Sequence, residues 1–191
     1  MEQVYTTDKQ FDAINFKEQS LPTGEYENCQ FKNCDFSNTS LSACKFIDCE
    51  FSGCDLSLVK LDQTVFRDVT FKGCKMLGLH FESCSEFGLS FSFDKCVLNH
   101  SSFYQTRIKK TSFSECQLKD TDFTECDLSN AILDRCDLSG ATFDNTNLEK
   151  ADLRTAYNYS IDPERNKISK AKFSLLSIAG LLDKYDLDIE G

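Results

Sequence analysis

The feature that most constrains this chain is the return of Leu or Phe at every fifth residue between Thr111 and Leu153. These large residues are Phe113, Leu118, Phe123, Leu128, Leu133, Leu138, Phe143, Leu148 and Leu153. A small residue precedes each of them by two positions: Thr111, Cys116, Thr121, Cys126, Ala131, Cys136, Ala141, Thr146 and Ala151. A period of five matches neither the roughly 3.6-residue period of an α-helix nor the two-residue period of a flat strand. We therefore expect a repeat structure.

A square coil satisfies this pattern. If the large and the small residue both point inward, the other three positions of each repeat point outward and carry polar side chains. Four repeats then close one turn of about twenty residues, and successive turns stack about 4.8 Å apart by parallel strand pairing. Each turn buries its apolar residues only against its neighbours, as in a solenoid. The predicted core of this segment includes Cys116, Leu118, Phe123, Cys126, Leu128, Cys136, Leu138 and Phe143.

The motif of Ala, Cys or Thr, then Asp or Asn, then Leu or Phe, then two polar residues resembles that of the pentapeptide-repeat proteins. The resemblance covers residues from about Ile14 to Phe173, which is most of the chain. It implies an all-β solenoid, a right-handed quadrilateral β-helix with about eight coils of four repeats each.

Three segments are expected along the chain. Residues 1–13 lack the motif and are predicted to cap the first coil, because an open end would leave strand edges unpaired. Residues 14–173 form the predicted coil, with an irregular excursion over residues 157–170, where Asn158 occupies a central position. Residues 174–191 complete the chain as a C-terminal helix and tail.

The coil contains one insertion, because the spacing within residues 83–95 exceeds a whole number of repeats by two residues. One interpretation brings Phe87 inside in place of Glu86 through a bulge, since a lone buried carboxylate is costly. The other keeps Phe91 in phase and places the extra pair between Ser92 and Lys95. The sequence leaves both open.

The end of the chain is predicted to form an α-helix from Ser174, as its cap, to about Tyr185. Its apolar residues lie on more than one face, so more than one surface must cover them. We expect the last coil to be one surface and a second copy of the chain to be the other. Gly180 costs about 1 kcal/mol inside a helix, which indicates a close approach of another backbone. The predicted homodimer interface consists of Leu175, Leu176, Ile178, Leu181 and Leu182.

All 11 cysteines fall on the small inward position of a repeat. There a free thiol acts as a small apolar side chain. Stacked cysteines would have parallel Cβ vectors with Cβ atoms slightly too far apart for a disulfide, and no histidine joins them as a metal ligand. We therefore predict reduced core thiols and a cytoplasmic protein. The start of the chain does not resemble a signal peptide, and no apolar run approaches a membrane span.

The sequence offers no candidate catalytic, cofactor-binding or metal-binding residue. The two histidines, His80 and His100, have no partner at catalytic or ligand spacing, and no glycine-rich phosphate loop is present. We therefore expect a protein that is not an enzyme and has no cofactor. Acidic residues outnumber basic ones by 31 to 21, which gives a net charge of −10 and argues against direct nucleic-acid binding.

Within the family, the chain most resembles the Qnr and MfpA type, because it combines a nearly full-length coil, an acidic exterior and a C-terminal apolar segment. This resemblance implies a dimeric DNA-mimicking rod that binds DNA gyrase or topoisomerase IV and counteracts quinolones. The coil body would be about 38 Å long and would carry a net charge of −10, whereas duplex DNA of that length carries about 22 negative charges. The mimicry would therefore be partial. The alternative is a scaffold for an unknown partner.

Candidate partner contacts come from two sets of outward residues. Outward apolar side chains are rare on this chain, and Leu58, Leu77 and Val97 fall on the same side of successive turns. Contiguous exposed apolar residues often mark contact sites. The second set is the acidic group Asp120, Asp122, Glu125 and Asp127.

Overall fold

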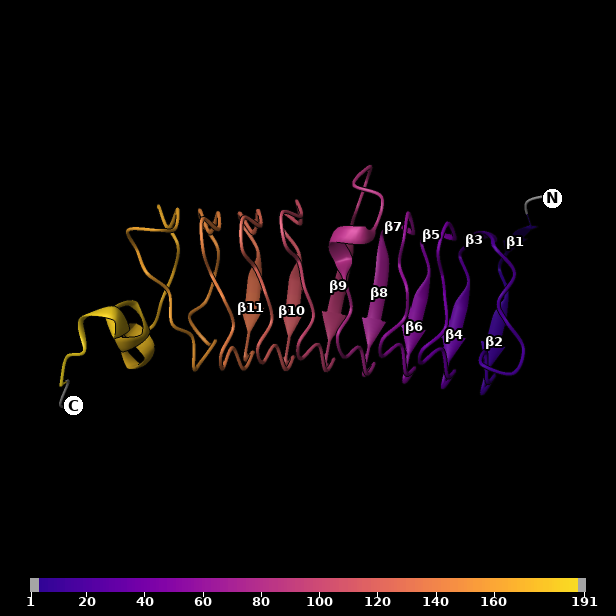
Figure 1. The fold of residues 1–191 in the computed structure, drawn as a ribbon, viewed down its shortest axis with the longest axis horizontal. Coiled ribbons are helices and arrows are strands. Elements are labelled where there is room, and N and C mark those ends of the chain that lie inside the picture. Colours follow the sequence, from indigo (N-terminus) through magenta and orange to yellow (C-terminus); the bar gives the residue numbers. More distant parts are fainter. Residues whose placement is uncertain (1–3, 189–191) are drawn as a thin grey trace.

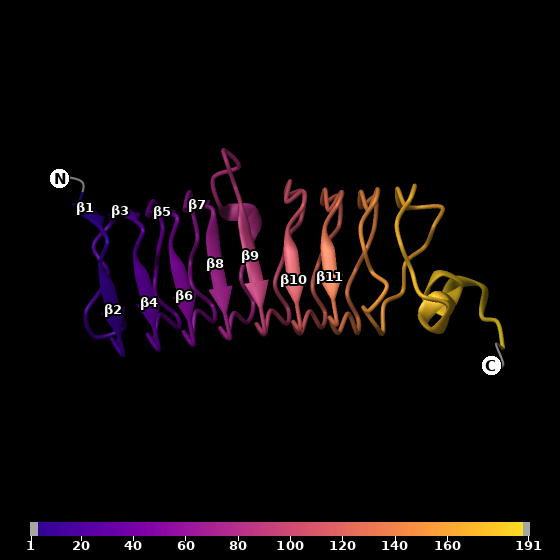
Figure 2. The same cartoon turned by 180° about the vertical axis from the view of Figure 1, so that it is seen from behind.

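The computed structural model describes residues 4–188, which form a rod of stacked coils with the two chain ends at opposite tips (Figure 1, Figure 2). The strands are β1 (Val4–Thr7), β2 (Gln10–Asp12), β3 (Gly24–Glu27), β4 (Gln30–Lys32), β5 (Lys45–Ile47), β6 (Glu50–Ser52), β7 (Val65–Arg67), β8 (Val69–Lys72), β9 (Phe91–Asp94), β10 (Ser112–Ser114) and β11 (Ile132–Asp134). The helical segments are η1 (Phe81–Ser83), η2 (Leu175–Leu181) and η3 (Asp183–Tyr185), all of the 3-10 type.

Parallel pairing between successive coils confirms the predicted solenoid. Strands β1, β3, β5 and β7 form one sheet, and the other seven strands form a second, in the order β11-β10-β9-β8-β6-β4-β2. The partners Phe31 and Phe51 show the register of twenty residues. Isolated parallel bridges, such as Asp35 with Asp55, continue the pairing on the remaining sides. Away from the insertion, each coil is therefore hydrogen-bonded to the next around its perimeter.

The start of the chain differs from the cap predicted over residues 1–13. In the part that is described, β1 pairs with β3 and β2 pairs with β4, so this segment belongs to the first coil. The reason is that Phe11 is in phase with the repeat and stacks on Phe31 with ring centroids 4.7 Å apart.

The corners of the coil need a left-handed backbone. Two residues after most central Leu or Phe residues, φ is positive, as at Asn33 (53°), Asp48 (52°) and Gly53 (63°). Gly, Asn and Asp reach this region at the lowest steric cost, which explains their frequency there.

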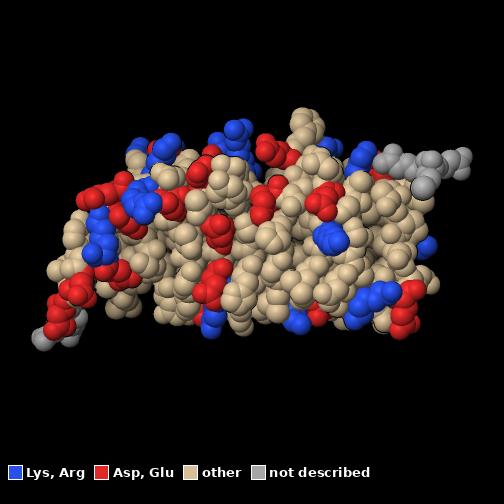
Figure 3. All heavy atoms as spheres, in the orientation of Figure 1, with Lys and Arg blue, Asp and Glu red and all other residues tan. Residues whose placement is uncertain are grey.

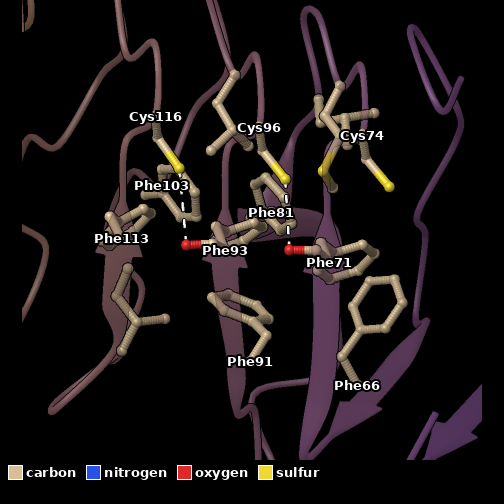
Figure 4. Close-up of a cluster of buried hydrophobic side chains, with 14 of the residues drawn as sticks. Phe66, Phe71, Cys74, Phe81, Phe91, Phe93, Cys96, Phe103, Phe113 and Cys116 are labelled. Carbon is tan, nitrogen blue, oxygen red and sulfur yellow. Dashed lines mark hydrogen bonds between the residues drawn. The ribbon is translucent and has the colours of Figure 1, made fainter. Parts of the chain in front are cut away.

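Rings from neighbouring coils stack along the interior (Figure 4). The centroid distances are 4.6 Å for Phe31 and Phe51, and 5.1 Å for Phe93 and Phe113. Offset stacking of this kind adds about 0.5–1.5 kcal/mol per pair to the burial of area. The eight residues predicted for the core of the 111–153 segment are all buried.

The small inward residues also join the coils by hydrogen bonds. The thiol of Cys96 donates to the carbonyl of Phe71 (3.4 Å), and that of Cys116 donates to the carbonyl of Phe93 (3.7 Å; Figure 4). The hydroxyl of Thr64 does the same (2.8 Å to the carbonyl of Leu41). The position therefore favours a small side chain that can donate, which Cys, Thr and Ser supply. All eleven thiols are free and buried.

The insertion takes a course that differs from both interpretations of the sequence. Phe87 is 80% exposed, and Phe91 is buried at the start of the regular strand β9. The extra residues lie before β9, in a loop between Ser85 and Ser90 that projects from the rod (Figure 1). Phe91, at a position that elsewhere holds a small residue, fills space beside Phe66 (ring centroids 6.5 Å apart). Because Phe91 fills this space, Phe87 can remain in solvent.

The C-terminal segment is helical as predicted but is of the 3-10 type rather than an α-helix. Ser174 lies at its N-cap without a capping side-chain bond. The carbonyl of Gly180 accepts from the N–H of Ile161 (2.8 Å), and a Cβ on Gly180 would lie 2.1 Å from the carbonyl oxygen of Tyr159. The backbone that approaches Gly180 therefore belongs to the same chain, and its bond to Gly180 ties the segment to the end of the coil.

Replacing a central residue should destabilise the coil far more than replacing an exposed one. Leu128→Ala should lower the free energy of unfolding by about 2–5 kcal/mol, because it leaves a cavity between stacked coils. Asp127→Ala, which removes a hydrogen-bonded carboxylate, should cost about 1 kcal/mol. The exposed Glu149→Ala should change it by less than about 0.5 kcal/mol. Denaturant unfolding measures all three, and equal losses would contradict the assignment of inward positions.

The thiols should be inaccessible until the coil unfolds. Blocking the unreduced protein in denaturant, followed by mass spectrometry, should give 11 modified cysteines, the number in the chain. The same reagent under native conditions should modify almost none within minutes, because every thiol is buried. Two or more disulfides in the purified protein would be incompatible with this core.

Candidate partner-binding surfaces

The cysteine and histidine side chains, which could act in catalysis or bind a metal ion, are either buried in the core or in contact with a carboxylate. Burial raises the pKa of Cys49 and of Cys126 to about 12, so these thiols stay protonated and unreactive at neutral pH. The ring of His80 contacts Glu82 (2.8 Å), and that of His100 lies 3.6 Å from Asp120. Residues 4–188 contain no group of three or more His, Cys, Asp or Glu residues that could hold a metal ion.

The acid of the repeat motif has a structural role. An Asp that precedes a central residue accepts a hydrogen bond from the backbone N–H two residues later, as Asp55 does from Ser57 (2.9 Å) and Asp137 from Ser139 (3.2 Å). Such a bond fixes the turn that follows. At Asp35, the hydrogen bond from Lys17 and that from Ser37 lower the pKa of the carboxyl group to about 2. These acids are therefore ionised and held in place at neutral pH.

Many carboxylates are also neutralised by basic residues, often from a neighbouring coil. Lys75 pairs with Asp55 (3.2 Å), and Arg165 pairs with Asp144 (2.6 Å). Within residues 4–188, the carboxylates that pair with a Lys or Arg are Glu25, Asp35, Glu50, Asp55, Glu115, Asp127, Asp134, Asp137, Asp144, Asp152, Asp162 and Glu164. The face in Figure 3 accordingly carries basic as well as acidic side chains. The exterior is thus less DNA-like than the net charge alone indicates.

The four acidic candidates do not form one face. Asp122 and Asp127 precede central residues on two different sides of the coil, and each accepts a backbone hydrogen bond. Partial burial would raise the pKa of Asp127, but its bonds with Ser129 and Lys109 lower it below the ordinary value. Glu125 accepts from the side chain of a Gln in the preceding coil (2.7 Å). Asp120, whose side chain is 59% exposed, is the most available of the four.

The apolar candidates lie on one side of the coil, but only Leu58 is exposed, whereas Leu77 and Val97 are half-buried. The N–H of Leu58 donates to the carbonyl of Leu77 (2.9 Å), and the N–H of Met76 donates to the carbonyl of Val97 (2.8 Å), so all three belong to one side of successive coils. Leu58 is 58% exposed and covers Gly78, where a Cβ would lie 2.9 Å from its Cδ2 atom. Leu58 also has a positive φ of 57°. Leu is less favourable than Gly, Asn or Asp at such a corner, by about 1 kcal/mol.

Sequence reasoning missed the exposed residue at the tip of the insertion. Phe87 projects into solvent, and Gly88 follows it with φ of 72°. The tip is a cluster without acids or bases at the top of the rod in Figure 3. A signal was present in Gly88, because Gly is one of the strongest local markers of a turn.

The predicted dimer residues divide into two groups. Leu175 and Leu176 are 90% and 100% exposed, and Ile178 is 38% exposed. Leu181, in contrast, packs on the core of its own chain, and Leu182 is only partly exposed. Leu181 is therefore not free for a partner, because the coil end already covers it. Within residues 4–188, no helix is long and apolar enough to cross a membrane.

Comparison with known proteins places the fold. The sequence model of the family described as "Pentapeptide repeat region" matches residues 25–92 and 79–153. The structure is similar to that of full-length QnrB1, a plasmid-mediated fluoroquinolone resistance protein, with a TM-score of 0.50, 19% sequence identity, and coverage of 96% of this chain and 100% of that chain. A trypsin-treated QnrB1 gives a TM-score of 0.50 at 20% identity, with coverage of 95% and 99%. HetL, a protein involved in heterocyst differentiation regulation from the cyanobacterium Nostoc sp., gives 0.46 at 14% identity, with coverage of 90% and 87%. No curated protein matches the sequence.

The five-residue repeat, the stacked coils and the family match over more than half of the chain together show that this protein belongs to the pentapeptide-repeat family.

Proposed function

We propose that this chain is a non-enzymatic, dimeric rod that binds a type II topoisomerase, DNA gyrase or topoisomerase IV, at the surface that holds DNA. The observation that carries the proposal is the end-to-end likeness to QnrB1, which spans 96% of this chain and 100% of that protein. QnrB1 is a fluoroquinolone resistance protein. A similar role for this chain would be to lower the effect of quinolones on the topoisomerase.

The charge of the rod supports partial mimicry of DNA. Much of the acid is paired with Lys or Arg, but the chain keeps a net charge of −10. Asp48 and Asp68 take the same corner of successive coils, and both are exposed. Charges of this kind attract a basic groove over a long range. They therefore raise the rate of association more than the affinity of the complex.

Contact specificity would then come from the apolar patch of Leu58, Leu77 and Val97 rather than from the acids. Polar corners offer a partner few distinguishing contacts. The exposed Leu58, with the half-buried Leu77 and Val97 beside it, would supply apolar area that is buried on binding. The alternative function, a scaffold for another protein, uses the same patch and differs only in the partner. It has in its favour that the ion pairs dilute the DNA-like charge.

A supercoiling assay tests the topoisomerase proposal. The protein should inhibit DNA gyrase at high concentration and should restore supercoiling in the presence of a quinolone at low concentration. Replacing both Leu58 and Leu77 with Ser should raise the concentration needed for either effect at least fivefold, with an almost unchanged Tm. Ile132→Ser is the matched control, because Ile132 is also an exposed outward residue (47%) but lies away from the patch. If the parent protein has no effect in either assay, the scaffold function is favoured.

The dimer is tested at the C-terminal segment. Changing both Leu175 and Leu176 to Glu should convert the dimer into a 21.7 kDa monomer in light scattering, because two charges replace apolar contact area. Phe87→Glu, at an equally exposed site far along the rod, should leave the dimer intact. A dimer that survives the double change would place the interface elsewhere, with the strands β1 and β2 as the next candidate.

A further inference from the structure

A cavity of about 330 Å³ lies beneath the inserted loop. The walls come from Phe81, Leu89 and Tyr104, and the charged residues Glu82, Glu86 and Arg107 also line it. Its volume falls within the range of about 300–1,000 Å³ that is usual for ligand pockets. Elsewhere the interior of the coil is filled by stacked Leu and Phe side chains.

The cavity exists because the insertion interrupts the pairing between two coils. The loop is tied to the preceding coil, through Ser85 to the carbonyl of Thr64 (2.9 Å) and Ser90 to the carbonyl of Phe66 (3.0 Å). On its other side, the N–H and C=O of Arg107 have no hydrogen-bond partner among residues 4–188. One coil further, the N–H of Asp127 donates to Thr106 (2.8 Å), and its C=O accepts from Ile108 (3.1 Å).

Arg107 therefore presents the edge of an open strand. The chain that would cover this edge in a regular coil has been drawn into η1 and the loop, where Ser83 bonds back to His80 instead (3.2 Å). An unpaired donor and acceptor in this arrangement can receive an extended peptide by strand addition.

The carboxylate of Glu82 adds a charge preference. One oxygen contacts His80 (Nδ1 to Oε1, 2.8 Å), while the other, Oε2, is buried without a hydrogen-bond partner in the structure. A buried oxygen of this kind is costly unless a donor reaches it. Glu86 at the exposed rim adds a second negative charge, and the Arg107 side chain is exposed and thus screened by solvent. At depth, the cavity favours a cation.

We propose that this cavity binds a short extended peptide segment that carries a basic side chain. The peptide backbone pairs with the N–H and C=O of Arg107, the alkyl stem of a Lys or Arg packs on Leu89 and Tyr104, and its charged end pairs with the carboxylate of Glu82. The binding partner is defined by this chemistry, and the inference does not rest on the proposed topoisomerase role.

The test titrates three synthetic peptides into the full-length, ¹⁵N-labelled chain. Binding is monitored by NMR through the shifts of the backbone amide signals. The probe is acetyl-Val-Lys-Val-amide. Its first control replaces Lys with norleucine, which keeps the stem and removes the charge, and its second carries a methyl group on each backbone nitrogen. The probe should shift the amide signals of Arg107, Gly88 and Leu89. Each control peptide should bind at least tenfold more weakly.

Two variants locate the charge. Glu82→Gln should weaken binding of the probe at least tenfold and remove the difference between Lys and norleucine. Asp144→Asn is the matched control. Asp144 follows a central Phe in the same column of stacked rings, as Glu82 does, but it does not line the cavity. This variant should leave binding of the probe unchanged.

Three results would overturn the proposal: no shifts up to 10 mM probe (on the order of the weakest short-peptide binding), shifts that map away from the loop, or equal binding of the lysine and norleucine peptides. The peptide controls decide the matter on the unmodified protein even if Glu82→Gln fails to fold.

Discussion

The structure depends on the contact between one coil and the next. No coil has an interior of its own, because four central side chains cannot cover one another without those above and below. The stacked rings at about 5 Å and the parallel strand spacing of about 4.8 Å agree in length, so that aromatic stacking and backbone pairing reinforce each other. The thiol and hydroxyl bonds from the small inward positions, such as Cys96 to the carbonyl of Phe71, add a third contact at the same spacing. A stacked column of Phe residues therefore fits this coil. A change in the length of a repeat does not fit within the coil, because it would break the contacts with the coils on either side.

That dependence explains why the irregular features gather at one place. Two additional residues cannot be absorbed inside a coil whose neighbours fix its perimeter, so they leave the rod as a loop, with Phe87 at its tip in solvent. The same displacement leaves Arg107 without its neighbour and opens the cavity at Glu82. The loss of a few inter-coil hydrogen bonds thus leaves a cavity in the solenoid at this place.

The acidic exterior has two roles that compete. An Asp before a central residue holds the next turn, and its remaining oxygen is available to a Lys or Arg, as at Asp55 with Ser57 and Lys75. The same carboxylates can resemble a phosphate row only where they have no basic neighbour. The proposed recognition of a partner would therefore depend on shape and on a few apolar contacts, such as Leu58 with its positive φ, as well as on charge.

The sequence by itself determined the coil, because a five-residue period admits few other solutions and the inward positions outside the insertion could be read from it. It also determined the state of the cysteines, since their place in the repeat is a packing position. The tertiary structure decided what the repeat leaves unspecified. The path of the insertion depended on whether Phe87 or Phe91 could fill the space beside Phe66, which is a matter of packing in three dimensions. The docking of the C-terminal segment on the coil end depended on the bond from Ile161 to Gly180, which joins residues that no local pattern relates. The ion pairs and the cavity likewise come from residues about twenty positions apart, because only coil stacking makes them neighbours.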